Sequence, residues 1–213
     1  MRKVFQAELQ QVGEELVQIA TLVKEALVRA SESFLNADVE EAEEVISNDA
    51  RIDFLQNQLD ERSIDILALQ GPVASDLRII VASLRMSSSL ERMGDLARHV
   101  AQIARMRFPE KAIPADVAPL FEKMVAADVK IIEDVVKLLD THELEHAEAI
   151  YTHKASLNQL HRDVFKAMNA PDWSHPPQVT VDVTLASRYL ERFGDHGVSV
   201  ARKVTYLVTG DWS

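Results

Sequence analysis

The sequence predicts an all-α protein made of two tandem three-helix bundles, six long helices in all. The seven prolines of the 213-residue chain gather in three places, so the stretches between them can run as uninterrupted helix. Apolar residues recur there at alternating spacings of four and three, the pattern of a helix packed in a bundle. A sequence motif of the first half also returns in the second half. Together these observations predict one bundle in each half of the chain.

The first half predicts helices at roughly 3–36, 39–70 and 73–106. Asp38 is expected to be the N-cap of the second helix, with Glu41 completing a capping box. Two apolar stripes support the first and third helices: Phe5, Leu9, Val12, Leu16, Ile19, Val23, Ala26 and Ala30 in the first, and Leu77, Val81 and Leu84 in the third. Gly71-Pro72 ends the second helix.

The second half predicts three more helices, ending near residues 140, 169 and 208. Asp116 is expected to cap the first of them, and Gly210 to stop the last. The segment before Asp116 is the most loop-like part of the chain, with Pro109 and Pro114. The predicted domains are therefore residues 1–108 and 116–213, joined by a linker at 109–115.

Composition excludes several classes of protein. The chain has no cysteine, so disulfides, thiol nucleophiles and zinc fingers are excluded, and oxygen or imidazole must hold any metal. A net charge of -11 disfavours nucleic acid as a partner. Because the sequence shows neither an export signal nor an apolar run long enough to cross a membrane, we expect a cytoplasmic protein.

The repeated motif is the most informative feature. Residues 91–101 and 191–201 are identical at six of eleven positions, including the leading Glu-Arg and the Gly-Asp that follows. Each copy places a glycine, Gly94 or Gly194, inside a helix, at a cost of about 1 kcal/mol relative to alanine. We therefore expect another backbone or a ligand to approach closely at both glycines.

Acidic residues gather on the predicted seam between the second and third helices. Glu91 and Asp95 lie one turn apart and continue the apolar stripe of their helix toward His99, while Asp49 and Asp53 do the same on the preceding helix. Four carboxylates pointing toward one seam need cations, protons or water. Hard oxygen ligands suit Mg, Mn, Ca or Fe, so a bound cation is the leading interpretation.

Two other interpretations remain open. In an acidic chain a Glu-x-x-x-Asp pair is usually a solvated helix face, and Arg92 and Arg192 can pair with the acids without any metal. A di-metal enzyme of the ferritin-like type needs two Glu-x-x-His elements, but only Glu143-x-x-His146 fits. The other histidines are expected on helical surfaces and in loops, except His99.

The chain resembles the PhoU family over essentially its whole length. The resemblance is carried by Glu91-Arg-Met-Gly-Asp95, Glu191-Arg-Phe-Gly-Asp-His196, Asp49-x-x-Ile-Asp53 and the ending Val204-Thr-Tyr-Leu-Val-Thr-Gly210. It implies two three-helix bundles with metal clusters, of Fe, Zn, Mn or Mg, on the acidic motifs. It also implies a non-enzymatic negative regulator that couples a phosphate-specific ABC transporter and its ATPase to a sensor histidine kinase. Family members are cytoplasmic, reach the membrane only through partners, and often form homodimers.

Residues carried over from the family are Asp49, Asp53, Glu91 and Asp95 in the first repeat, and Glu191 and Asp195 in the second. Where the family commonly has asparagine, the chain has His99 and Ser199.

The second repeat departs further from the family pattern. Lys154 and Asn158 stand where the first repeat has Asp49 and Asp53, and Asp128 stands opposite Val23. We expect Lys154 to neutralise Glu191 or Asp195, so that the second site binds metal weakly or not at all, with partial compensation from Asp128. The leading hypothesis is thus a metal-binding regulator. The alternatives are a metal-free helical adaptor and, less favoured, a di-metal carboxylate enzyme.

Overall fold

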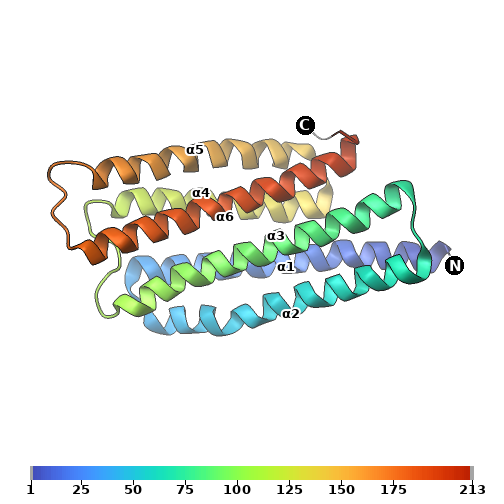
Figure 1. The fold of residues 1–213 in the computed structure, drawn as a ribbon, viewed down its shortest axis with the longest axis horizontal. Coiled ribbons are helices and arrows are strands. Elements are labelled where there is room, and N and C mark those ends of the chain that lie inside the picture. Colours follow the sequence, from blue (N-terminus) through green and yellow to red (C-terminus); the bar gives the residue numbers. More distant parts are fainter. Residues whose placement is uncertain (1, 212–213) are drawn as a thin grey trace.

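The computed structural model describes residues 2–211, and these residues form six helices. The helices are α1 (Arg2–Asn36), α2 (Val39–Gln70), α3 (Ala74–Arg107), α4 (Ala118–Thr141), α5 (Leu144–Met168) and α6 (Pro177–Thr209). Figure 1 shows α1, α2 and α3 as one elongated bundle lying alongside a second bundle of α4, α5 and α6. The predicted all-α class with tandem three-helix bundles is confirmed.

The two bundles meet through α3 against α6, and through α1 against α4 (Figure 1). The contacts between α3 and α6 join residues of increasing number on α3 to residues of decreasing number on α6. These two helices are therefore antiparallel. Ser89 lies 3.5 Å from Ser199, measured between Oγ atoms, and Arg107 pairs with Asp182 at the far end. The buried apolar side chains of both bundles form one continuous core. The division into domains at residues 1–108 and 116–213, with a linker at 109–115, therefore stays a prediction.

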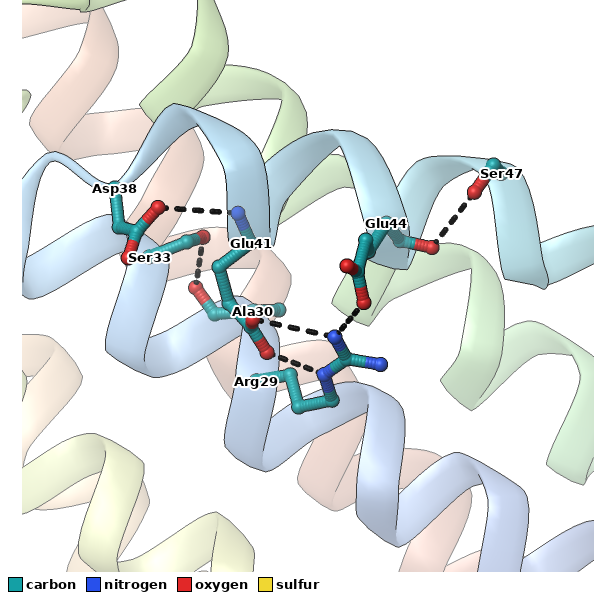
Figure 2. Close-up of polar contacts among 7 residues, drawn as sticks. All are labelled: Arg29, Ala30, Ser33, Asp38, Glu41, Glu44 and Ser47. Carbon is teal, nitrogen blue, oxygen red and sulfur yellow. Dashed lines mark hydrogen bonds and ion pairs between the residues drawn. The ribbon is translucent and has the colours of Figure 1, made fainter.

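The corner between α1 and α2 confirms the N-cap but not the capping box. Asp38 Oδ1 accepts a hydrogen bond from the backbone N–H of Glu41 at 3.1 Å. The Glu41 side chain does not return this bond. It pairs instead with Arg29 of α1, which also binds Glu44, as Figure 2 shows. The guanidinium offers a charged partner, which a carboxylate prefers to a backbone amide.

The expected cap of α4 is wrong. Val117 occupies the N-cap position without a side-chain hydrogen bond, and Asp116 lies outside the helix. Its Oδ2 atom lies 2.9 Å from His175 Nε2, so Asp116 joins the linker to the loop before α6. The helix ends at glycine are confirmed, since Gly71 and Gly210 adopt left-handed backbone with φ of 54° and 83°.

The predicted buried stripe of α3 is also wrong. Leu77 and Val81 keep 40% and 38% of their surface exposed, whereas Ile80 and Leu90 are fully buried. The reason is that α3 packs against α1, α2 and α6 at once, so burial extends around several of its faces and includes small polar residues such as Ser87. Leu84 is only partly buried, and the acidic residues that continue this row lie at the edge of the core.

Among residues 2–211, no helix combines the length and the hydropathy needed to span a bilayer.

Candidate functional site: the two acidic clusters

The first acidic cluster lies between α2 and α3, with Asp49 and Asp53 on α2 and Glu91 and Asp95 on α3. The side chains of Asp49, Asp95 and Glu91 are only 12%, 16% and 21% exposed, whereas Asp53 is exposed. The structure therefore brings three of the four predicted acids to a half-buried seam and leaves the fourth at its rim.

Burial makes ionisation costly at two of these acids. Burial raises the pKa of Asp49, although Arg98 acts in the opposite direction. Burial also raises the pKa of Glu91, and the nearby charges of Asp95 and Asp53 add to that rise. A bound cation would stabilise the ionised form of both side chains.

Arg98 is the main finding that the sequence analysis missed at this cluster. Its guanidinium bridges the two helices, with Nε 2.5 Å from Asp49 Oδ2 and Nη2 2.5 Å from Asp95 Oδ1. Arg92 lies 2.8 Å from the other oxygen of Asp95 and 3.5 Å from Glu91. Burial opposes ionisation of Asp95, but the two arginines outweigh it and lower its pKa. The spacing of Asp95 and Arg98, three residues apart on one helix, was a usable signal.

Gly94 is explained by the neighbouring helix. A Cβ atom at this position would lie 3.0 Å from Ile52 Cδ1 and 3.7 Å from Asp49 Oδ1. The close approach predicted from the glycine therefore exists, but a side chain of α2 makes it, rather than a backbone. The glycine lets α3 lie close to α2, and this is what brings Asp49 toward Asp95.

His99 lies on a different seam from the acids it was grouped with. Its ring packs against Tyr189 of α6, with centroids 5.0 Å apart. Burial lowers its pKa, as does the charge of Arg98, and both favour the neutral imidazole. Its Nδ1 atom is buried and finds no hydrogen-bond partner among the described residues. No hydrogen bond or ion pair joins His99 to the cluster in this part of the chain.

The second acidic cluster carries its own cation, as predicted from Lys154. Lys154 Nζ lies 3.0 Å from Glu191 Oε1 and 2.8 Å from Asp195 Oδ1, and it donates to the Glu191 carbonyl at 2.6 Å. Arg188 pairs with the remaining oxygen of Glu191 at 2.5 Å. Arg192, expected to contribute, makes no ion pair among the residues described. The Lys154 ammonium thus occupies the position between Glu191 and Asp195 that a metal ion would take.

Asp128 of α4 is a buried acid beside this cluster. It is fully buried, and both carboxylate oxygens find no hydrogen-bond partner within residues 2–211. Burial raises its pKa well above the ordinary range, with only partial opposition from the charge of Lys154. Burial therefore favours the neutral form of Asp128, and no ion pair joins it to Lys154 among the described residues.

The two clusters fit a metal ion to different degrees. At the first, the donor chemistry fits: carboxylates of Asp49, Glu91 and Asp95 are hard ligands whose ionisation burial disfavours. A metal there must displace Arg98 from Asp49 and Asp95. At the second, the Lys154 ammonium already supplies the positive charge, so the residues present do not fit a metal.

One further group has metal-binding geometry. Within the described part of the chain, only Glu143, Glu145 and His146 bring three candidate ligand atoms within 4.8 Å of one another. His146 Nδ1 also lies 3.0 Å from Asp134 of α4. From the sequence alone, Glu143-x-x-His146 is a single ferritin-like element without a second copy. The group is largely exposed at the start of α5.

Comparison with known proteins identifies the family. A family model described as the PhoU domain matches residues 16–104 and, a second time, residues 121–204. The chain belongs to the PhoU family. The two matches fall on the two bundles, so each bundle is one PhoU domain. This agrees with the internal repeat found in the sequence.

Relatives in the PhoU family match along the whole chain. One is phosphate-specific transport system accessory protein PhoU homolog 2 of Mycobacterium tuberculosis, which is 39% identical over 210 residues and 99% of both chains. PhoU homolog 1 of Mycobacterium leprae is 35% identical over 100% of this chain and 96% of its own. The crystal structure of PhoU from Pseudomonas aeruginosa superposes with a TM-score of 0.88 at 27% identity, covering 97% of this chain and 100% of that one.

Proposed function

We propose that this protein is a non-enzymatic accessory regulator of phosphate transport, which couples a phosphate-specific ABC transporter to a sensor histidine kinase and represses the phosphate-starvation response. The observation that carries the proposal is the match, over 99% of both chains, to relatives named as accessory proteins of phosphate-specific transport. Its partners are then the transporter ATPase and the kinase. Its location is then cytoplasmic, and it reaches the membrane through these partners as a homodimer, in the manner of other family members.

We infer further that the first acidic cluster is the metal site. Asp49, Glu91 and Asp95 would hold a divalent or multinuclear centre, with Asp53 completing it from the rim of the seam. The support is the burial of three carboxylates and the raised pKa of two of them. Bound metal would crosslink α2 to α3 and replace the Arg98 bridge. His99 and the second-repeat pair Glu191 and Asp195 contribute less, because one faces α6 and the others pair with Lys154.

A metal-free helical adaptor is the second candidate function. It is favoured by Arg98, which already joins Asp49 to Asp95 at 2.5 Å on each side. In that case arginine supplies the charge that the acids require, and the cluster serves only the stability of the bundle. Partner binding would then be independent of divalent cations.

A capture experiment separates these functions. The kinase sensor domain and the transporter ATPase are each immobilised and offered the wild type, the double variant Glu91→Gln/Asp95→Asn, and Glu148→Gln as a control on the exposed surface of α5. The regulator proposal predicts capture of the wild type and the control by both partners. If the wild type is captured by neither, the proposal is overturned.

The double variant then assigns the role of the cluster. Loss of both metal and partner binding means that the metal acts as a switch. Loss of metal with partner binding intact means that the cluster is structural, as in the adaptor.

A further inference from the structure

On the seam between α3 and α6, Lys203 lies near the charges of Arg85 and of its neighbour Arg202, and none of the three has an acidic partner among the described residues. Arg85 lies on α3, and Arg202 and Lys203 lie on α6. None of them is within ion-pair distance of a carboxylate in the described part of the chain. Because the protein has 34 acidic and only 23 basic residues, these three neighbouring cations form a positive region on an otherwise acidic chain.

Lys203 is held in place by its own helix. Its ammonium donates to the carbonyl of Ser199 at 3.0 Å and to Ser199 Oγ at 2.6 Å, and the side chain is half-buried. Burial lowers the pKa of Lys203, and the charges of Arg85 and Arg202 lower it further. The three like charges therefore repel one another across a partly desolvated seam, and an anion placed among them would relieve that repulsion.

A cavity of about 480 Å³ opens beside these cations between α5 and α6. Its polar lining consists of Lys154, Asn158, Asp195, Ser199, Arg202 and Lys203. The one carboxylate in this lining, Asp195, lies 2.8 Å from Lys154, so its charge is balanced. The cavity is consequently positive although the protein as a whole is negative.

The first repeat has no counterpart to this cavity. At an offset of 100 residues, Arg202 and Lys203 correspond to Gln102 and Ile103, and Ile103 is buried in the core. The cationic lining is therefore a feature of the second repeat alone. It stands beside the cluster in which Lys154 replaces a metal ion.

We propose that this cavity binds a phosphate ion, with Arg202 and Lys203 as charged donors and Asn158 and Ser199 as neutral ones. Charge-assisted hydrogen bonds from guanidinium and ammonium groups are the usual means of holding phosphate oxygens. Asp195 adds selectivity, because the O–H of hydrogen phosphate can donate a hydrogen bond to a carboxylate, whereas sulfate has no O–H to donate at neutral pH. The proposal depends neither on metal at the first cluster nor on the regulatory role.

The test is calorimetric titration of the full chain with inorganic phosphate near neutral pH, at constant ionic strength, with sulfate as the comparison anion. Loss of one charge-assisted hydrogen bond should weaken phosphate affinity roughly tenfold to hundredfold in Lys203→Gln. Lys130→Gln, which removes an exposed lysine from α4, is the control and should leave the affinity unchanged. Lys203→Arg should retain binding, and sulfate should bind more weakly than phosphate.

Thermal melting monitors the fold of each variant. If Lys203→Gln proves unstable, Arg202→Gln carries the same test, because its side chain is exposed. Absence of saturable phosphate binding by the wild type up to about 10 mM overturns the proposal. Equal weakening by Lys130→Gln does so as well, because binding would then follow net charge rather than this cavity.

Discussion

Lys154 of α5 places its ammonium 2.8 Å from Asp195 of α6, inside the acidic motif of the second repeat. The equivalent position of the first repeat is Asp49, so one repeat presents a cation where the other presents a carboxylate. This single exchange makes the two clusters electrostatically different although the motif around them is the same.

The first prediction concerns Lys154 itself. Lys154→Ala leaves Asp195 without a cation and Glu191 with Arg188 alone, and removing one partner of a buried ion pair costs about 3 kcal/mol. Urea denaturation should show that loss. Lys154→Asp restores the first-repeat pattern and should make the second cluster responsive to divalent cations, with a rise in melting temperature on adding Mn²⁺. No response of Lys154→Asp to any divalent cation would show that Lys154 is not what excludes the metal.

The second prediction concerns Asp128. Its pKa is raised in the folded state, so the unfolded chain binds fewer protons here, and stability is lost as pH rises through the folded-state pKa. Asn cannot ionise, so Asp128→Asn avoids this loss of stability and should raise the free energy of unfolding by about 1 kcal/mol or more at alkaline pH. The increase should be smaller at acidic pH, where Asp128 is protonated in both states. Denaturation at several pH values checks this. A gain that is largest in acid would contradict it.

The third prediction concerns Arg98. Because its guanidinium bridges Asp49 and Asp95, Arg98→Gln should destabilise the metal-free protein and tighten divalent-cation binding at the first cluster. Calorimetric titration with Mn²⁺ measures the second effect. Arg105→Gln is the matched control, since Arg105 lies two helical turns further along α3 and makes only a 3.8 Å pair with Glu43. Unchanged or weaker Mn²⁺ binding by Arg98→Gln would mean that arginine and metal do not compete.

The fourth prediction compares two helical glycines. A Cβ atom at Gly197 would lie well inside van der Waals contact of Ile131 Cγ2, a branched methyl close to the α4 backbone. Gly197→Ala should therefore destabilise the protein by about 1–3 kcal/mol. Gly13 has nothing within 4 Å of the same position, so Gly13→Ala should stabilise it by about 1 kcal/mol. Thermal melting of both variants measures these changes in stability. A stabilised Gly197→Ala would show that α4 and α6 pack less tightly than the structure indicates.

Much of the fold could be predicted because the helices follow local rules. Glycine and the N-cap Asp38 end and begin helices through contacts with their immediate neighbours, and those positions agree with the structure. The failures are non-local. Leu77 and Val81 were assigned to a buried stripe, but α3 is buried by three helices whose arrangement no single helical period reveals.

In the candidate site, too, local features could be predicted from the sequence and those set by other helices could not. Pairing of Lys154 with Glu191 and Asp195 could be predicted, because the internal repeat aligns Lys154 with an acid of the first cluster. The direction of His99 could not, because α6 decides it through Tyr189. Arg98 was within reach of sequence reasoning, one helical turn from Asp95, but its bridge to Asp49 depends on how closely α2 approaches α3 at Gly94.

The central claim is that the two repeats differ in metal binding, and anomalous scattering from crystals grown with Mn²⁺ or Fe tests it most directly. We expect an anomalous peak among Asp49, Glu91 and Asp95, with Arg98 displaced, and no peak at Glu191 and Asp195, where Lys154 remains. Equally occupied metals in both repeats, or metal at the second cluster alone, would contradict it.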